Sequence, residues 1–208
     1  MNMKILITGA SRGIGAACAK KFAESGNSEI FLVSRNKEAL NKLKADIDKD
    51  KTGSDIHVLS TDLEKEENIR ELMAEIKKKT KRLDIILNNA GNLVNKDFAR
   101  VSLKEINRIF SVNYTAPAII IKEGLPLLKE AIKPHVVNIS SMGGFQGSEK
   151  FPGLSHYSAS KAALAVLTEC LAVEFRDEIS FNSLAIGSVQ TEMLEEAFPG
   201  YKAPLQPD

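Results

Sequence analysis

Two residues that could transfer a proton, Tyr157 and Lys161, lie four positions apart in a segment with helical spacing. That spacing places both side chains on one face of a helix, about one turn apart. A phenol with its ordinary pKa of about 10 is a poor acid near neutral pH, and a neighbouring ammonium group would lower that pKa. Such a pair could supply the proton that the reduction of a carbonyl group requires. Two residues on an ordinary helix would show the same spacing, so the pair alone is weak evidence.

Glycine residues cluster where a short apolar run ends and a helical pattern begins. The string TGASRGIG covers Thr8 to Gly15. Glycine lets the backbone turn sharply and approach a ligand closely, and the free N–H groups at a helix N-terminus favour a phosphate. A plain tight turn is the alternative, but the position between a first strand and a first helix is the one that a dinucleotide-binding turn requires. Its G-x-x-x-G-x-G spacing departs from the common G-x-G-x-x-G pattern.

The elements that must position these residues are short apolar runs alternating with longer amphipathic segments. The predicted strands are Lys4–Thr8, Ile30–Ser34, Ile56–Ser60, Leu83–Asn88, His135–Ser141 and Ile179–Ile186. The predicted helices are Ile14–Ser25, Lys37–Lys49, Glu64–Lys81, Leu103–Glu130 and Tyr157–Arg176. This alternation predicts a single α/β domain over residues 1–208, with a Rossmann-type, doubly wound parallel sheet in three layers. A ligand should then lie beyond the carboxyl ends of the strands, where the strand order reverses.

Composition describes an ordinary globular protein and argues against several classes of partner. The 208 residues are 43% apolar and 26% charged, with a net charge of +1. This gives no electrostatic reason to expect nucleic acid or an anionic membrane surface. No signal peptide or membrane-spanning run is visible, so we expect a cytoplasmic protein without a membrane partner. We also expect no metal site, structural or solvent-facing roles for His135 and His156, buried free thiols at Cys18 and Cys170, and a loop or disordered end from Phe198 onward.

Three further motifs join the glycine turn and the tyrosine–lysine pair. NNAG at Asn88–Gly91 follows the fourth predicted strand, VNISS at Val137–Ser141 closes the fifth, and AIGSVQTEM at Ala185–Met193 follows the sixth. In this order and over residues 8–193, the set resembles the short-chain dehydrogenase/reductase family. The resemblance implies a reversible hydride transfer between a nicotinamide cofactor and a carbonyl or alcohol.

The resemblance also implies catalytic roles. Tyr157 would be the acid/base, Lys161 would lower its pKa, and Ser141 would hydrogen-bond the substrate oxygen. Ser140, the neighbouring serine, would be a strand-end residue or would lie beside the substrate. Asn113 would bend the long helix and bind a water molecule that connects the lysine to solvent.

Residues around the cofactor follow from the same resemblance. Asp62 would contact the adenine amine, Asn88 and Ala90 would line the adenosine ribose, and Thr191 would hold the nicotinamide carboxamide. The complete set of expected cofactor-binding residues is Gly9, Ser11, Arg12, Gly13, Ile14, Gly15, Ser34, Arg35, Asp62, Leu63, Asn89, Ala90, Gly91, Tyr157, Lys161, Gly187, Val189 and Thr191.

The end of the second predicted strand indicates which nicotinamide cofactor is used. NAD sites usually place an acidic residue there to bind the ribose 2′-hydroxyl, but this chain has Ser34 and Arg35. Arg12 in the glycine turn is a second cation that could reach a 2′-phosphate, which guanidinium groups bind well. Solvated arginines are the alternative reading. The expected cofactor is therefore NADP(H).

Departures from the family pattern leave some points open. Ile186 stands where proline is usual, so the loop that carries Thr191 could be looser. A long segment between Ser141 and Tyr157 should shape specificity, with Phe145, Phe151 and Leu154 as an apolar wall. The family usually continues beyond the equivalent of Asp208, so we expect the lid and last strand to be missing. A homodimer or homotetramer is expected.

The substrate stays open among a 3-oxoacyl thioester, a pterin side-chain ketone, a sugar and other small carbonyl compounds. The alternative function is a catalytically silent, NADP(H)-binding regulatory protein.

Overall fold

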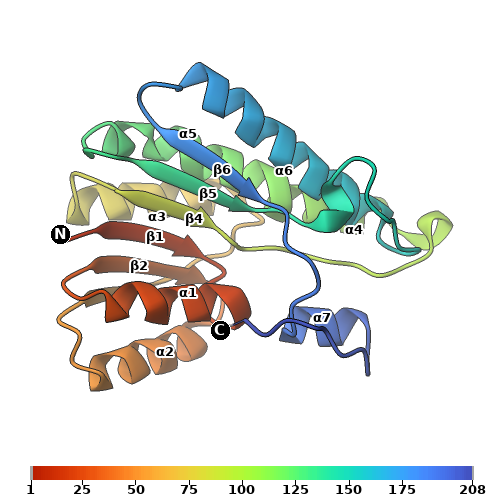
Figure 1. Ribbon diagram of the computed structural model, residues 1–208, viewed down its shortest axis with the longest axis horizontal. Coiled ribbons are helices and arrows are strands. Elements are labelled where there is room, and N and C mark those ends of the chain that lie inside the picture. The colour runs from red at the N-terminus through yellow and green to blue at the C-terminus, as the bar shows by residue number, and fades with distance from the viewer. Residues whose placement is uncertain (1, 208) are drawn as a thin grey trace.

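The computed structural model describes residues 2–207 and contains one sheet of six parallel strands between two layers of helices (Figure 1). The strand order is β3-β2-β1-β4-β5-β6. The strands are β1 Lys4–Thr8, β2 Glu29–Ser34, β3 Asp55–Ser60, β4 Ile85–Asn88, β5 His135–Ile139 and β6 Ser180–Leu184. The order reverses between β1 and β4, so the predicted doubly wound, three-layer fold is confirmed.

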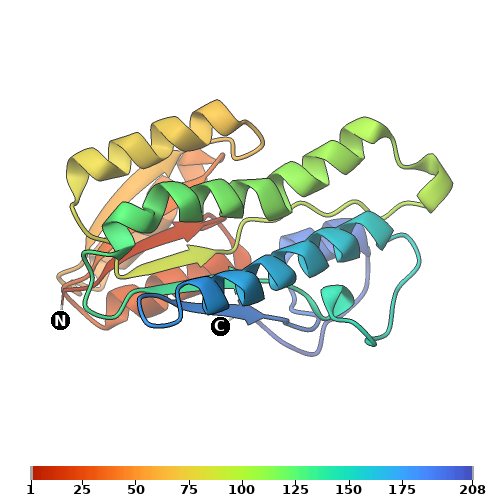
Figure 2. The same cartoon turned by 90° about the horizontal axis from the view of Figure 1, so that it is seen from above.

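Helices connect successive strands and cover both faces of the sheet. They are α1 Gly13–Glu24, α2 Lys37–Lys49, α3 Glu66–Lys79, α4 Leu103–Phe110, α5 Ala116–Leu128, α6 Ser155–Glu174 and α7 Glu192–Ala197. Short 3-10 turns, η1 Phe98–Arg100 and η3 Met142–Gly144, lie in the loops before α4 and α6. α3 packs beside α5 and α4 beside α6 on one face (Figure 2), while α1 and α2 cover the other.

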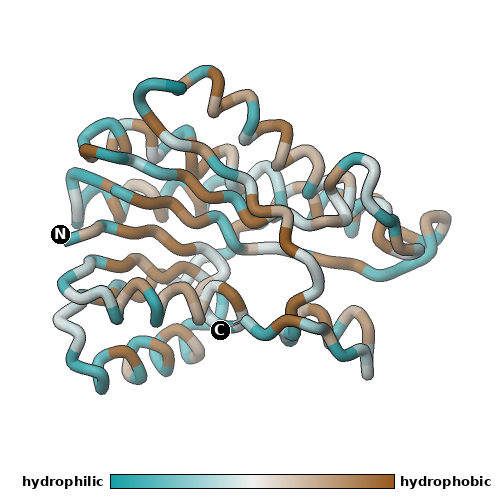
Figure 3. Tube along the Cα trace, viewed as in Figure 1, coloured by the Kyte–Doolittle hydropathy of each residue, from teal (hydrophilic) through white to brown (hydrophobic). Residues whose placement is uncertain are grey.

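Alternation along the strands divides the apolar core into two clusters. In β1, Ile5 and Ile7 pack with α1 and α2, whereas Leu6 packs with the side of α3 and α5. This follows from the period of two in a strand, which sends neighbouring side chains to opposite faces. The central strands are consequently continuous apolar segments (Figure 3), as expected for a parallel sheet that is covered on both sides.

The predicted helix over Leu103–Glu130 is interrupted. α4 ends at Phe110, and a π-helical turn, Ser111–Thr115, joins it to α5. A π turn takes one extra residue and is often found at functional positions. Asn113, where the family resemblance implied a bend, lies in this turn and is fully buried.

The two cysteines differ in their exposure. Cys18 and Cys170 are free thiols, but Cys170 is exposed on α6 and only Cys18 is partly buried. The expectation of burial was wrong for Cys170 because its position on the helix faces away from the sheet.

Within residues 2–207, no helix is both long enough and apolar enough to cross a bilayer.

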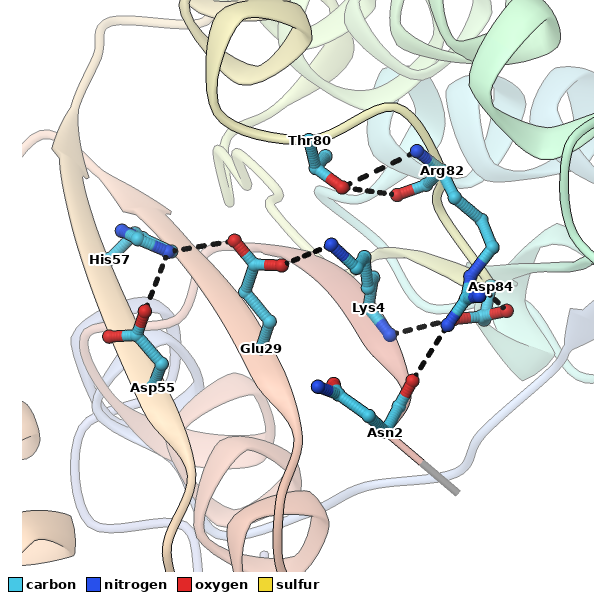
Figure 4. A network of polar contacts seen from close by, with 8 residues as sticks. All are labelled: Asn2, Lys4, Glu29, Asp55, His57, Thr80, Arg82 and Asp84. Carbon is cyan, nitrogen blue, oxygen red and sulfur yellow. Dashed lines mark hydrogen bonds and ion pairs between the residues drawn. The ribbon is translucent and has the colours of Figure 1, made fainter.

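Charged side chains connect the amino ends of the strands, at the edge of the sheet opposite the predicted ligand site (Figure 4). Glu29 is the centre: its carboxylate lies 2.7 Å from the Lys4 ammonium and 3.0 Å from His57 Nε2. His57 Nε2 is also 3.3 Å from Asp55 Oδ2, and the Lys4 backbone N–H donates to Asp84 at 2.8 Å. The network thus links the starts of β1, β2 and β3 to the residue before β4.

Glu29, Asp55 and His57 are also the group in the described part of the chain whose ligand atoms are close enough to hold a metal ion. The sequence did not indicate this group, because its members are brought together by pairing of β2 with β3. Each of these side chains already has a hydrogen-bond or ion-pair partner here, including Lys4 on Glu29. In this structure the group is held together by ion pairs, and the absence of a metal site stays an expectation.

Replacing Glu29 with glutamine should lower the free energy of unfolding by about 1 kcal/mol, because a partly buried lysine and histidine lose their shared carboxylate. Urea unfolding followed by circular dichroism would measure the change. Glu24→Gln is the matched control, since Glu24 pairs with Lys21 on the exposed face of α1 and such pairs contribute little. Equal midpoints for the two variants would contradict the role given to Glu29.

Candidate active site

A cavity of about 490 Å³ opens at the carboxyl ends of the strands, where β1 and β4 separate in strand order. Three of the residues predicted for the site do not line it, and two of these, Gly15 and Asn113, lie buried behind its walls. Asn88, expected beside the adenosine ribose, does not line it either. Asn88 is buried and donates from Nδ2 to Asn138 Oδ1 at 2.8 Å.

The glycine turn forms one wall of the cavity. Gly9 and Gly13 have φ angles of +65° and +55°, which side-chain-bearing residues rarely adopt. A Cβ on Gly15 would lie 2.5 Å from Asn89 Nδ2 and even closer to the Gly9 carbonyl oxygen. The turn can therefore pack against the end of β4 only because these positions lack side chains, and it leaves the N-terminus of α1 facing the cavity.

Hydrogen bonds hold this turn against its neighbours. The Thr8 hydroxyl accepts from the backbone N–H groups of Asn89 and Ala90, each at 3.1 Å. Asn89 Nδ2 donates to the carbonyl oxygens of Thr8 and Gly9, also at 3.1 Å. The NNAG motif thus acts first as a brace for the glycine turn.

Two arginines lie at the end of the cavity beside β2. Arg35 is exposed immediately after β2, and Arg12 is the N-cap residue of α1. Arg12 pairs with Glu196 of α7 at 2.8 Å, and this pairing lowers the pKa of Glu196. Ser11 and Ser34, which join the glycine turn to β2 through a 2.8 Å hydrogen bond, line the same region.

Tyr157 and Lys161 lie one turn apart on α6, and both face the cavity. Burial raises the pKa of the Tyr157 phenol, and a polar contact with the Ser141 side chain opposes that rise. The Lys161 Nζ is 5.9 Å from the centre of the phenol ring and donates a 2.7 Å hydrogen bond to the Ile139 carbonyl oxygen. Burial is the larger influence on the Tyr157 pKa in this geometry, and the expected lowering by Lys161 stays a prediction.

Lys161 itself is strongly affected by its surroundings. Its side chain reaches into the protein from α6, and the residue is only 4% exposed. Burial lowers its pKa to about 8, because a charged ammonium loses its hydration there. The amine can therefore change its protonation state near pH 8.

Of the two serines at the end of β5, Ser140 is engaged in the fold. Its hydroxyl donates to the Lys161 carbonyl oxygen at 2.9 Å, and the residue is buried. Ser141 is half-buried beside Tyr157, and its hydroxyl accepts from the Gly143 N–H at 3.2 Å. Ser141, unlike Ser140, therefore has a hydroxyl that does not donate to the backbone of α6 and that lies beside Tyr157.

Asn113 holds the loop after β4 to α6. Its Oδ1 accepts from the Asn92 N–H at 2.7 Å, while its Nδ2 donates to the Asn92 carbonyl oxygen and to Ser160 Oγ, both at 2.9 Å. Ser160 Oγ in turn donates to the Tyr157 carbonyl oxygen at 2.7 Å. Asn113 therefore fixes the helical turn that carries Tyr157 and Lys161.

Several wall residues were missed by the sequence analysis. Met193 and Leu194 of α7 and the following Phe198 and Tyr201 cover the cavity, although the segment from Phe198 was expected only as a loop or disordered end. Thr191, expected at the nicotinamide, lines the cavity and also caps α7 by accepting from the Leu194 N–H at 3.3 Å. The pattern Thr-Glu at positions 191–192 is typical of a helix start and could have indicated α7.

Two of the three residues expected to form an apolar wall line the cavity. Phe151 and Leu154 line the cavity, but Phe145 does not; it lines a separate groove nearby. That part of the prediction was wrong because η3 turns the chain between Ser141 and Phe145. Ile186 leaves the loop well attached, since its N–H donates to the Leu184 carbonyl oxygen and its own carbonyl accepts from the Met142 N–H.

Comparison with known proteins identifies the class that this fold and site define. Residues 3–202 match the family described as short chain dehydrogenase. The 3-oxoacyl acyl-carrier-protein reductase of Aquifex aeolicus is 33% identical over 189 residues, which cover 90% of this chain and 74% of that protein. The chain therefore belongs to the short-chain dehydrogenase/reductase family of oxidoreductases.

Solved structures agree with this assignment. A short-chain dehydrogenase from Sphingobium yanoikuyae in complex with NADPH is 29% identical, with a TM-score of 0.88 over 99% of this chain and 80% of that one. A short-chain dehydrogenase from Escherichia coli CFT073, also complexed with NADPH, is 30% identical, with a TM-score of 0.88 over 100% of this chain and 87% of the other.

The buried amine gives a prediction about stability. Below about pH 8 the folded protein carries a buried ammonium at Lys161, whereas the unfolded chain carries a solvated one until about pH 10.5. Because the folded state loses this proton first, wild-type stability should rise relative to Lys161→Met between these pH values, on the order of 3 kcal/mol. Urea unfolding of both proteins across this window would measure the difference.

Lys20→Met, at an exposed position of α1, is the control and should follow the wild-type curve at each pH. A constant difference between wild type and Lys161→Met across the window would contradict the lowered pKa.

Proposed function

We propose that this protein reduces a carbonyl compound to an alcohol, or catalyses the reverse reaction, with NADP(H). The observation that carries the proposal is the convergence of Ser141, Tyr157 and Lys161 on the same cavity as the glycine turn. A proton donor, an oxygen-binding hydroxyl and a phosphate-binding helix terminus at one site match the needs of this reaction.

The residues of the cavity fit the cofactor. The side-chain-free surface of Gly9 and Gly13 and the N-terminus of α1 are suited to a diphosphate. Arg12 and Arg35 provide guanidinium groups for a 2′-phosphate, and no carboxylate follows directly after β2 to repel it. The NADPH complexes of the two similar structures support this choice.

We assign the other cofactor contacts to residues that line the cavity. Asp62 and Leu63 would hold the adenine, Ala90 and Gly91 the sugar region, and Thr191 the nicotinamide carboxamide. The remaining proposed contacts are with Ser11, Ile14, Ser34, Asn89, Gly187 and Val189.

When bound, the reduced nicotinamide supplies a hydride. Tyr157 would donate its phenolic proton to the substrate oxygen, and Ser141 would hydrogen-bond that oxygen as negative charge develops. Lys161 would stabilise the resulting phenolate and provide a proton for its recovery, which its pKa of about 8 allows near neutral pH. Asn113 would keep these groups aligned by holding Asn92 and Ser160, and its part in a water relay remains a proposal.

The assembly expected from the sequence also remains a proposal: a homodimer or homotetramer. Exposed apolar side chains on α6, Val166 and Val173, support a contact between copies through this helix.

Tyr157→Phe should lower kcat for a reactive ketone by about 10²–10⁴-fold, because the proton donor is lost. Its Kd for NADPH should change little, since the hydroxyl alone is removed. Absorbance of the reduced cofactor during turnover and fluorescence titration of NADPH would provide the two measurements. Tyr201→Phe, which changes a second tyrosine lining the cavity, is the control and should keep most of the activity.

Equal turnover by wild type and Tyr157→Phe would refute the catalytic assignment. NADPH binding without turnover of any ketone by the wild type would instead favour the catalytically silent regulatory protein.

Arg35→Asp should reduce the preference for NADPH over NADH by about tenfold or more, because a favourable charged contact is replaced by repulsion. The ratio of kcat/KM for the two cofactors would measure this preference. Arg100→Asp, an exposed arginine in η1 outside the cavity, should leave the ratio unchanged. An unchanged ratio for Arg35→Asp would remove Arg35 from the phosphate site.

A further inference from the structure

Helix α7 lies against the glycine turn, with its start beside the N-terminus of α1 (Figure 1). Thr191 is its N-cap residue, and a Cβ on Gly13 would lie 3.1 Å from Thr191 Cγ2. Further along α7, Glu196 Oε1 is 2.8 Å from a guanidinium nitrogen of Arg12. The pair thus joins the glycine turn to a helix whose acidic residue lies 184 positions further along the chain.

Arg12 is the point at which this ion pair meets the cavity. Arg12 lines the cavity, whereas Glu196 lies outside the lining. Within residues 2–207, Arg12 has a carboxylate partner and Arg35, the other arginine proposed for the 2′-phosphate, has none. The side chains of Arg12 and Glu196 are 47% and 66% exposed. A pair as exposed as this is weak, so Arg12 can exchange its partner for another anion.

The position of α7 does not depend on the ion pair. Asn95 Nδ2, in the loop after β4, donates to the Ala197 carbonyl oxygen at 2.9 Å. The Gly200 N–H donates to Glu195 Oε1 at 3.0 Å and holds the chain that follows the helix. The Arg12 side chain can therefore leave Glu196 while these bonds keep α7 in place.

A 2′-phosphate and the Glu196 carboxylate would use the same guanidinium group. Arginine binds a phosphate best through two parallel N–H groups, and one of its nitrogens is already bonded to Glu196. Arg12 must give up this bond or, if it keeps the bond, attract the phosphate less strongly because its charge is already balanced. NADH carries a hydroxyl group in place of the phosphate and leaves the pair undisturbed.

We propose that Glu196 determines cofactor selectivity: its carboxylate competes with the 2′-phosphate of NADPH for Arg12, and so weakens the binding of NADPH but not of NADH. The inference rests on the proposed function, in which Arg12 binds the 2′-phosphate, and adds a residue that opposes this contact. The preference for NADPH is then a balance between two anions at one arginine.

Glu196→Gln tests the proposal, because it removes the charge and keeps the size of the side chain. Kd for NADPH, measured by fluorescence titration, should fall by about threefold at low ionic strength, as expected for an exposed ion pair. Kd for NADH should stay unchanged. Binding of 2′,5′-ADP, which carries the 2′-phosphate without the nicotinamide, should tighten equally, and binding of 5′-AMP should not. In about 1 M salt the gain should shrink, because the charges are screened.

Two further variants separate competition at Arg12 from a general effect of charge. Glu195→Gln removes the same charge from the neighbouring position, where the carboxylate bonds to the Gly200 N–H, and it should leave both Kd values unchanged. Arg12→Gln should weaken NADPH. When Glu196→Gln is added to Arg12→Gln, Kd for NADPH should change little further, because the group for which the two anions compete is gone.

A Kd for NADPH that is unchanged or raised in Glu196→Gln would overturn the proposal, as would an equal gain for NADH. An equal gain with and without Arg12 would overturn it as well, since competition needs the arginine. Each of these results leaves the proposed function standing when the wild type reduces ketones with NADPH. A selective gain for NADPH in a protein that reduces no ketone would support the role of Glu196 and refute the proposed function.

Discussion

The close approach of the β1–α1 turn to the end of β4 is the constraint on which the rest of the molecule depends. A side chain at Gly9 or Gly15 would clash with neighbouring atoms, and hydrogen bonds of Asn89 and Thr8 join the two segments. The strand order reverses at this point, so the space above it is left open by the fold itself. This contact thereby defines the wall of the cavity at which the N-terminus of α1 lies.

The opposite wall depends on buried polar groups. A ladder of side-chain hydrogen bonds runs from Asn88 through Asn138 to Thr168 and ties β4 and β5 to α6. Asn113 connects the loop after β4 to the same helix, through its bonds with Asn92 and Ser160. Polar groups in the interior are tolerated when they are bonded, and here they orient α6 more specifically than apolar packing would. The lowered pKa of Lys161 is a consequence of its buried position on this helix.

The sequence was sufficient for the sheet and for most helices, because their apolar periods of 2 and 3.6 are strong. The α2 boundaries were predicted to the residue. The sequence did not predict the π turn, because the segments on both sides of it are helical and were taken as one helix. α7 was missed because it has only six residues. Phe145 and Asn92 show a further limit: what they contact is decided by loop paths and by partners distant in the chain.

The π turn at Ser111–Thr115 has a consequence for how this segment can vary. One additional residue shifts the winding of everything that follows by roughly 100°, so α4 and α5 are two helices with different phases in one continuous rod. Each keeps its own apolar stripe in contact with the protein only while that extra residue is present. A one-residue deletion would therefore be especially disruptive there, because shortening would rotate one half of the rod, exposing its core face or turning Asn113 out of the interior.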